Sequence, residues 1–548
     1  MSVDETSAAD PVTRPVLTLS VKTLAWAVAG LLFVLLRLAP VWQAPVNGAE
    51  IAHLSGAWQA HLGAADDRFV PTLFQALAAL SLHLTSSPVL ARAVAFAAAA
   101  TIPGALYLLR SRLGEAGALV ALLLLAVDAP ALALGSQASA MGFDLPLTLW
   151  LFVLMTRGTR ARWLAPVAAL LVATGGPLAL PLLFGWAAAR LWERDYPTSR
   201  TAAPTAVAVV AGIVVTSLHF GLNSDGPIVA PFQLFATGYD QAWFSGTLMD
   251  AAVLYSWPLL LWAAVAAGVR IARRPRPRLD RYDRVLAGWT VAAAAWAISS
   301  SQSHTVVPLV ALSMPLALWL GPVGANAISA MVKADWQHAR FLVPAAGFTV
   351  VLGGAIASGW AHTGHATAAE TAFLALLAGL SLLALAPLAI RRSARPALIA
   401  PVLAVAVPLL ALAAGVALSA TDEPILSPRV APDARSLRDI ALQAAGDRQG
   451  LIVVHPQFRA DITWPFRDSG NLVVSSRVPG DAIVVLWPRE LIRPEGFVAL
   501  EGNWALTREV VPPSPGAADY LPYLRWLIDR HSVTIKPSKL AVYIRATE

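Results

Sequence analysis

The chain has 548 residues, of which 57% are hydrophobic and only 13% charged, and it contains no cysteine. Soluble globular proteins carry about twice this share of charge, so a soluble fold is excluded, as are disulfides, thiolate metal sites and a cysteine nucleophile. The formal net charge of +7 does not indicate a nucleic-acid partner, because the basic residues lie in short clusters between apolar runs, as the positive-inside rule expects of a membrane protein.

About thirteen apolar segments approach the roughly 20 residues that a helix needs to cross a bilayer. They are predicted at 22–41, 88–109, 116–135, 143–157, 163–175, 177–192, 203–221, 250–270, 285–300, 305–321, 341–360, 371–390 and 397–419. Arg-rich connectors such as 156–162 and 270–284 fall on one side if the spans alternate. We therefore predict a bacterial inner-membrane protein with a cytoplasmic tail at 1–21 and everything after Ala420 on the periplasmic side.

The composition changes after Ala420, where charged residues become frequent and no further stretch could span a membrane. Helices are predicted within 436–450 and 521–531, and short β-branched runs predict strands at 451–455, 471–476, 482–487 and 539–545. The predicted fold is a polytopic α-helical membrane domain at 22–419, with interfacial helices at about 45–85 in its first outer loop, followed by a soluble α/β domain at 420–548.

Four charged residues end or begin predicted spans near the outer membrane interface: Arg37, Arg92, Asp128 and Asp144. A charge inside a bilayer is costly and marks a functional candidate, although a paired or snorkelling interfacial charge is the alternative for each residue alone. Their gathering on one side of the membrane favours a site that faces the periplasm.

The first outer loop adds Glu50, which precedes a helical-looking stretch. Glu50 could take part in chemistry or could only cap that helix, where an acid favours the helix dipole. His53 and His61 could share a helix face, but two histidines are weak evidence for a metal. The neighbouring acids at 66–67 fit a solvated turn.

Several segments resemble the GT-C glycosyltransferases that use polyprenyl-phosphate sugars, the superfamily of the protein O-mannosyltransferases and aminoarabinose transferases. The similar segments are the acidic outer loop followed by the Pro71-containing stretch 70–114, ALGSQASAMGFDLPLTLWLFVLM (133–155), SSSQSHTVVPLVALSMPLALWLG (299–321) and ITWPFRDSGNLVV (462–474). The last segment and YLRWLIDRH resemble an Agl23-like prokaryotic branch.

The resemblance implies a GT-C-like fold and a glycosyltransferase that moves a sugar, with inversion, from a polyprenyl-phosphate donor to a glycan, lipid or protein acceptor at the periplasmic face. It implies Glu50 as the base and Asp144 as its partner, with Arg92 and His304 at the donor phosphate. The two carboxylates could also share a divalent metal, Mg²⁺ or Mn²⁺. The chain departs from the family in having Ala49 where the leading acid is usual, and a histidine, His304, at the basic position.

Aromatic residues supply further candidates for contact with sugar or acceptor, namely Tyr239, Trp243 and Trp464. Belt residues at the membrane interface, or a fold-stabilising corner in the case of Trp464, are the alternatives. A transporter or lipid flippase, and a non-catalytic scaffold of a cell-envelope polysaccharide machine, are the competing function classes. The predicted polar groups gather at one interface rather than at the bilayer midplane, which favours the enzyme over a transporter.

Overall fold

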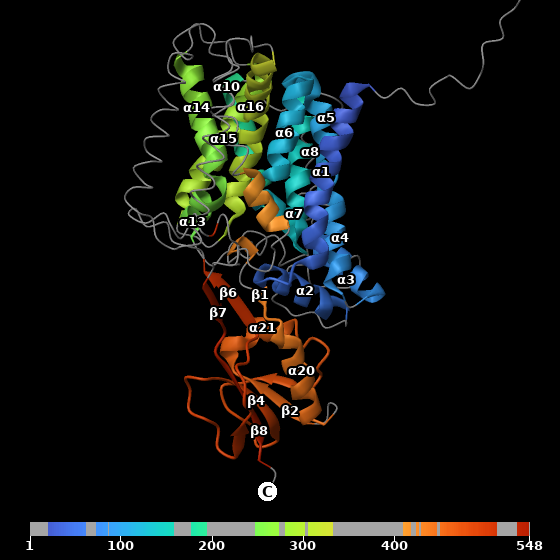
Figure 1. The fold of residues 1–548 in the computed structure, drawn as a ribbon, viewed down its shortest axis with the longest axis vertical. Helices are drawn as coiled ribbons and strands as arrows, with labels where there is room; N and C mark the ends of the chain where they lie inside the picture. Colours follow the sequence, from blue (N-terminus) through green and yellow to red (C-terminus); the bar gives the residue numbers. More distant parts are fainter. Residues whose placement is uncertain are drawn as a thin grey trace, which may run out of the picture.

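The structure of the protein is a computed structural model, which describes residues 20–61, 73–85, 87–157, 177–193, 247–272, 280–301, 305–332, 409–417, 424–426, 429–446, 450–511, 526 and 534–546. Long helices form a bundle, and the C-terminal strands and short helices form a second body at one end of it (Figure 1). We refer to these two parts as the bundle and the C-terminal body.

The helices of the amino-terminal third are α1 (Val21–Gln43), α2 (Gly48–His61), α3 (Leu73–Leu84), α4 (Pro88–Ala99), α5 (Ile102–Leu113), α6 (Glu115–Val127), α7 (Ala129–Ser136) and α8 (Ala140–Arg157). The central helices are α10 (Ala179–Glu193), α13 (Leu248–Ala251), the π-helix η4 (Ala252–Ser256), α14 (Trp257–Ala272), α15 (Arg281–Ser299) and α16 (Val307–Val332). These helices match predicted spans, apart from α2 and α3, which match the predicted interfacial helices.

By length and composition, four stretches of the described chain could cross a membrane, or five if the bent pair α6 and α7 is one span. The four are Val21–Trp42, Pro88–Leu113, Leu248–Ala267 and Val307–Ser329. Four predicted spans lie outside the described residues: 163–175, 203–221, 341–360 and 371–390. The total of about thirteen spans therefore stays a prediction.

The segment predicted as one span at 116–135 is bent by 69° between α6 and α7. Asp128 causes the break, because its backbone is extended and its Oδ2 accepts a hydrogen bond from the backbone N–H of Ala131 at 3.1 Å, which caps α7. Pro130 in the first turn of α7 fits this new start. The predicted span at 116–135 is therefore present as two apolar helices with a bend between them that was not predicted from the sequence.

One face of α1 is apolar and exposed. Its exposed residues recur at spacings of three and four, and each leaves more than half of its surface uncovered: Val21, Leu24, Val28, Leu31 and Leu35. Such a stripe would be unfavourable in water and suits the hydrocarbon of a bilayer.

Helices approach closely where glycines meet. A Cβ on Gly185 of α10 would collide with the backbone of Gly288 and Trp289 in α15, and a Cβ on Gly321 of α16 would collide with the carbonyl of Gly117 in α6. Small residues of this kind let helix backbones pack in contact, as they commonly do in membrane proteins.

The elements of the C-terminal body are η6 (Pro424–Leu426), β1 (Arg429–Val430), α20 (Asp433–Ala444), β2 (Leu451–Val454), η7 (Pro456–Phe458), α21 (Arg459–Thr463), β3 (Leu472–Val474), β4 (Ala482–Pro488), β5 (Phe497–Ala499), β6 (Thr507–Val511), β7 (Thr534–Pro537) and β8 (Leu540–Arg545). The four predicted strands are confirmed as β2, β3, β4 and β8, and the predicted amphipathic helix as α20. The helix predicted at 521–531 lies outside the described residues except Trp526, which is helical.

Five strands form the main sheet in the order β3-β2-β4-β8-β5. Strand β2 is parallel to both β3 and β4, whereas β8 is antiparallel to β4 and β5. Helix α20 contributes Leu437 to a buried core with Val454, Val484 and Val542 from the central strands. The C-terminal body is therefore the small α/β fold that its alternating apolar runs predict.

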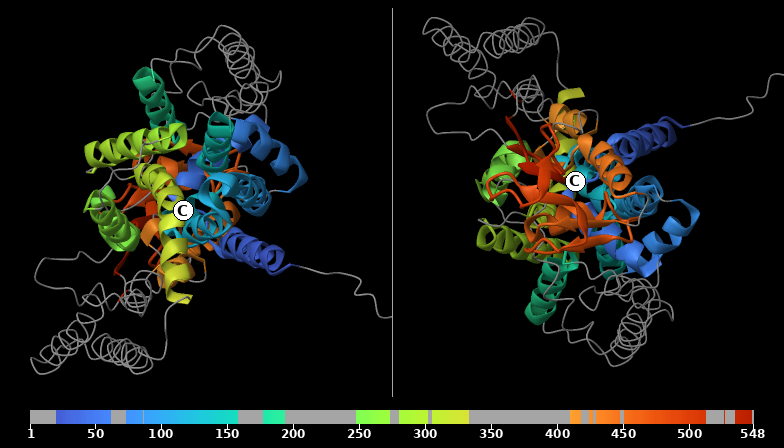
Figure 2. Two further views of the ribbon diagram at one scale, coloured as in Figure 1. Left: turned by 90° about the horizontal axis from the view of Figure 1, so that it is seen from above. Right: turned by 90° about the horizontal axis from the view of Figure 1, so that it is seen from below.

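A smaller antiparallel sheet, β1-β6-β7, joins the C-terminal body to the bundle. The backbone N–H of Val430 in β1 donates to the carbonyl of Val46 at 2.8 Å, and Asn47 pairs with Arg429 as an isolated bridge. The connection between α1 and α2 thus extends this sheet by one position. Helices α2 and α3 lie between the two bodies, and the view from below shows the C-terminal body across the end of the bundle (Figures 1 and 2).

Candidate functional site

Glu50 lies in the first turn of α2 and takes part in a reciprocal cap of that helix. The Glu50 backbone N–H donates to Asn47 Oδ1 at 2.9 Å, and the Asn47 backbone N–H donates to Glu50 Oε2 at 3.2 Å. This pattern is a capping box, in which two backbone donors at the helix start are satisfied by side chains. The capping role considered from the sequence is therefore present, and it fixes the carboxylate at the junction of the two bodies.

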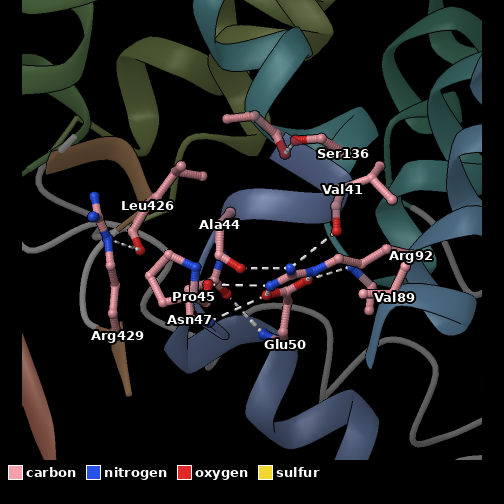
Figure 3. A network of polar contacts seen from close by, with 12 residues as sticks. Val41, Ala44, Pro45, Asn47, Glu50, Val89, Arg92, Ser136, Leu426 and Arg429 are labelled. Carbon is pink, nitrogen blue, oxygen red and sulfur yellow. Dashed lines mark hydrogen bonds and ion pairs between the residues drawn. The ribbon is translucent and has the colours of Figure 1, made fainter. Parts of the chain in front are cut away.

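Arg92 approaches Glu50 from α4, a helix that Ser87 caps. Its guanidinium donates to both Glu50 oxygens, from Nε at 2.7 Å and from Nη2 at 2.6 Å (Figure 3). It also donates to the carbonyls of Val41 and Ala44 from Nη1, and to that of Pro45 from Nη2. These contacts use the five N–H donors that an arginine possesses.

The Glu50–Arg92 pair is almost completely buried, with side-chain exposures of 1% and 2%. A buried pair is stable only when its remaining lone pairs and protons are satisfied, and here Ala138 N–H completes the set by donating to Glu50 Oε1 at 2.7 Å. Each carboxylate oxygen thus accepts from two donors. The pair joins α2, α4, the end of α1 and the segment before α8 into one rigid node.

Asp144 does not join this node. It is fully buried in α8, and its Oδ2 accepts a hydrogen bond from the backbone N–H of Leu178, just before α10, at 2.6 Å. Its Oδ1 has no hydrogen-bond partner among the described residues. Since no hydrogen bond or ion pair connects Asp144 with Glu50 or Arg92 in this part of the chain, the predicted partnership of the two carboxylates stays a prediction.

The other charged span ends, Arg37 and Asp128, lie at the break between α6 and α7. Arg37 donates from Nη2 to the Leu125 carbonyl at 2.9 Å and stacks over the Phe33 ring at 3.7 Å. Asp128 Oδ2 accepts from Ser313 Oγ of α16 at 2.9 Å in addition to capping α7. These contacts make both residues part of the bundle core.

Three predicted site residues lie outside the described residues, namely His304, Tyr239 and Trp243. So do the loop acids at 66–67. Within the described chain, no group of three or more His, Asp or Glu side chains is placed to hold a metal ion. A shared metal at Glu50 and Asp144 stays a prediction.

Trp464 is described, and it lies at the contact between the two bodies. It is 5% exposed and packs in one cluster with apolar residues of α2 and α3, including Leu54 and Phe74. Its neighbour Arg467 stacks over the Trp464 ring at 4.2 Å, and the Arg467 carbonyl accepts from Trp58 Nε1 of α2 at 3.0 Å. The segment after α21 thus fastens the C-terminal body to α2.

A cavity of about 540 Å³ opens between the bundle and the C-terminal body. Pro45 and Val46 line it from the α1–α2 connection, Ser87 and Pro88 from the start of α4, and the segments 430–438 and 464–468 from the C-terminal body. Pro45 is also a carbonyl partner of Arg92, so the cavity lies directly beside the Glu50–Arg92 node. Its volume is within the range of small-molecule sites.

Three arginines of this cavity were not predicted as a group: Arg435 and Arg438 on α20, and Arg467 after α21. Two of them are three residues apart on an amphipathic helix, which is the signal that could have indicated a shared basic face. Their position against residues of the first loop could not be predicted, because it depends on how two distant segments dock.

The fold is similar to that of ArnT from Cupriavidus metallidurans bound to undecaprenyl phosphate, with a TM-score of 0.51 and 13% identity over 83% of this chain and 86% of that chain. The apo structure of the same ArnT aligns with a TM-score of 0.49 and 15% identity, with the same coverage of both chains. No protein-family model and no curated protein matches this chain. The predicted architecture, a helical bundle followed by an α/β body, is confirmed and its fold is similar to that of ArnT, whereas the GT-C superfamily, the number of spans and the Agl23-like branch stay predictions.

Proposed function

We propose that the protein is a membrane glycosyltransferase that moves a sugar from a polyprenyl-phosphate donor to an acceptor at the periplasmic face, with the C-terminal body on that side. One observation carries the proposal: a cavity lined by three arginines lies beside the buried Glu50–Arg92 node, at the junction of the bundle and the C-terminal body. The fold shared with an undecaprenyl-phosphate-bound ArnT supports the choice of donor.

The reaction is a single displacement at the anomeric carbon of the donor sugar. The acceptor hydroxyl oxygen forms the new glycosidic bond while the bond from the anomeric carbon to the phosphate oxygen breaks, and the polyprenyl phosphate leaves with the electron pair. A carboxylate accepts the hydroxyl proton, and cationic side chains stabilise the charge that develops on the phosphate. One such displacement inverts the anomeric centre.

The node suggests how donor binding could prepare the base. Glu50 already accepts from four donors, two of them on Arg92, so in this arrangement it is occupied. A donor phosphate that bound Arg92, with His304 beside it, would compete with Glu50 for the guanidinium. Glu50 would then be released to accept the acceptor's proton only when donor is present, and Asp144 would act as its partner.

No step in this scheme passes through a metal. The Glu50 oxygens face a guanidinium, and no three His, Asp or Glu side chains of the described residues are grouped to hold a metal ion. A divalent cation next to Arg92 would experience like-charge repulsion. If Mg²⁺ or Mn²⁺ takes part, Glu50 and Asp144 remain the residues proposed to hold it, after rearrangement.

A transfer assay tests the proposal. Purified full-length protein in nanodiscs is given radiolabelled polyprenyl-phosphate sugars and membrane extract, and label in the acceptor is measured together with released polyprenyl phosphate. We expect transfer by the wild type and its loss in Glu50→Gln and Asp144→Asn. The matched control is Glu115→Gln, because Glu115 is an exposed acid in an ion pair with Lys22 at 3.2 Å.

Two results would contradict the assignment: no transfer with any donor, or transfer that survives both Glu50→Gln and Asp144→Asn. Reconstituted liposomes separate the competing classes. A flippase would carry the labelled lipid across the bilayer without releasing polyprenyl phosphate, and a scaffold would do neither.

A further inference from the structure

The cavity at the junction carries an excess of positive charge. Among its described lining residues, three are arginines and one, Asp468, is acidic, which gives a net formal charge of +2. The arginines come from two elements of the C-terminal body, α20 and the segment after α21. A cavity with this net positive charge favours binding of an anion.

The acids nearby neutralise the cavity only in part. Arg438 pairs with Asp439 at 3.1 Å, while its distance to the Asp468 carboxylate is 3.8 Å, the long end of an ion pair. Arg435 is exposed and lines the cavity. At least one guanidinium is therefore available to a ligand.

The third guanidinium is held in place. Arg467 Nη1 donates to the Trp464 carbonyl at 3.1 Å, and the guanidinium stacks on the Trp464 ring. Burial lowers the pKa of Arg467. The adjacent Asp468 carboxylate raises this pKa, and the like charges of Arg438 and Arg435 lower it. A bound anion would offset the charge of these arginines as Asp468 does.

The remaining walls suit a sugar. Several prolines and the edge of the largely buried Trp464 supply apolar surface, and the first turn of α20 lines the cavity with the positive end of its helix dipole. Carbohydrate rings bind through such mixed surfaces, with apolar faces against rings and polar groups at the edge. A volume of about 540 Å³ accommodates one or a few sugar residues rather than a lipid tail.

We propose that this cavity binds the acidic group, a carboxylate or phosphate, of a sugar in the acceptor, and that Arg435, Arg438 and Arg467 recognise it. The inference rests on the proposed function, because it names the chemistry of the acceptor for the same reaction. The acidic group anchors the acceptor from the C-terminal body while the reacting hydroxyl is presented toward the Glu50–Arg92 node.

Binding of defined probes tests the proposal without any transfer step. Full-length protein in phosphatidylcholine nanodiscs is titrated by calorimetry with trigalacturonic acid and with its neutral methyl ester, and likewise with glucose 6-phosphate and glucose. We expect at least one acidic probe to bind roughly tenfold more tightly than its neutral counterpart, with a preference that weakens as salt is raised.

Variants locate the binding. Arg435→Gln/Arg438→Gln should abolish the preference for the acidic probe, whereas the control Arg459→Gln/Arg477→Gln, which removes two exposed arginines outside the cavity lining, should retain it. Asp468→Asn provides a change of opposite sign and should strengthen acidic-probe binding several-fold. This variant keeps the test decisive if the double variant folds poorly.

Equal affinity for acidic and neutral probes, or a preference that survives in Arg435→Gln/Arg438→Gln, would overturn the inference. A third arm replaces part of the phosphatidylcholine with phosphatidylglycerol. If only the anionic lipid binds at these arginines and no soluble probe does, the cavity is a lipid-headgroup site and the inference is wrong. The binding experiment contains no donor, so its failure would not contradict the proposed transfer reaction. A failed transfer assay would likewise not change the measured binding of the acidic probes.

Discussion

Asn47 and Glu50 each bind the other's backbone nitrogen, at 2.9 Å and 3.2 Å. The same carboxylate also holds Arg92 from α4, so one side chain both starts α2 and ties it to the bundle. The capping box involves positions 47 and 50 and not position 49, so the absence of an acid at Ala49 leaves this architecture intact. A structural and a catalytic role for Glu50 are compatible only if donor binding can separate it from Arg92.

The ion pair predicts strong coupling in a double-mutant cycle. Arg92→Met leaves a buried carboxylate without its counter-charge and should destabilise the protein by about 3–5 kcal/mol. Glu50→Gln/Arg92→Met should cost clearly less than the sum of the single changes. Thermal unfolding in detergent of purified Glu50→Gln, Arg92→Met and the double variant measures the change in stability for each.

The control cycle uses Lys22 and Glu115, which form an exposed ion pair with side-chain exposures of 73% and 36%. Its coupling should stay within about 1 kcal/mol. Additive effects at Glu50 and Arg92, no larger than in this control, would show that the buried pair is not an energetic unit.

The crossing of α10 and α15 makes a second prediction. Gly185→Ala places a methyl group against the α15 backbone and should lower the midpoint of thermal unfolding by several degrees, because the helices must separate. Gly30→Ala in α1 is the matched control: a Cβ there meets nothing within 4 Å, so helix propensity alone applies and the change should be neutral or stabilising by up to about 1 kcal/mol. A Gly185→Ala midpoint equal to that of Gly30→Ala would contradict the close crossing.

Much of the fold could be predicted because it depends on local patterns. The β-branched run at 482–487 gives β4 and the apolar run at 305–321 gives α16, since periodicity and length are properties of short windows. The break at Asp128 was missed, although an acid followed by Pro130 is a helix-start signal. The apolar run at 116–135 is long enough for one span, and its length hides the break.

The site could be predicted only in part. Glu50 and Arg92 were singled out together, and the structure brings them into contact, but the sequence does not show that they saturate each other. The approach of Arg467 to Trp58, 409 residues apart in the chain, depends on docking between the two bodies. Such long-range contacts follow from the complete fold and leave no periodic signal in a single sequence.

The contact between α2 and the C-terminal body predicts a local effect. Trp58→Phe removes the hydrogen bond to the Arg467 carbonyl while keeping an aromatic ring, and should destabilise the docking by about 1 kcal/mol. Hydrogen–deuterium exchange should increase in α2 and in 464–469 and remain unchanged in α6 and α16. The matched control is Trp42→Phe, at a residue that is 65% exposed. Uniform exchange in Trp58→Phe and the wild type would show that this hydrogen bond does not hold the two bodies together.

Chelation tests the role of metal. Because no three His, Asp or Glu side chains of the described residues are grouped to hold a metal and Glu50 faces Arg92, we expect transfer in the assay above to survive treatment with excess EDTA. Mg²⁺ or Mn²⁺ added afterwards should change the rate by less than about twofold. Loss of transfer on chelation, with recovery on adding one of these ions, would show instead that Glu50 and Asp144 rearrange around a cation.

His53 predicts how stability depends on pH. Burial lowers the pKa of this histidine from 6.5 to about 4, and the nearby Glu50 carboxylate opposes the shift only in part. The unfolded chain therefore binds more protons than the folded protein between these two values, so stability is complete above pH 6.5 and is lost as the pH falls toward 4. At about 1.4 kcal/mol for each pKa unit, and because the residue as a whole is only partly buried, the loss should be on the order of 1–3 kcal/mol.

His53→Phe removes the titrating group and keeps an aromatic ring against Phe74, whose ring centroid lies 5.8 Å from that of His53. Thermal unfolding at pH 7 and pH 4.5 should show a smaller acid-induced loss in His53→Phe than in the wild type. His83→Phe, at an exposed position near the end of α3, is the control and should follow the wild type. If wild type and His53→Phe lose stability in parallel, the acid sensitivity comes from other groups, and His53 is not held in its neutral form by the junction.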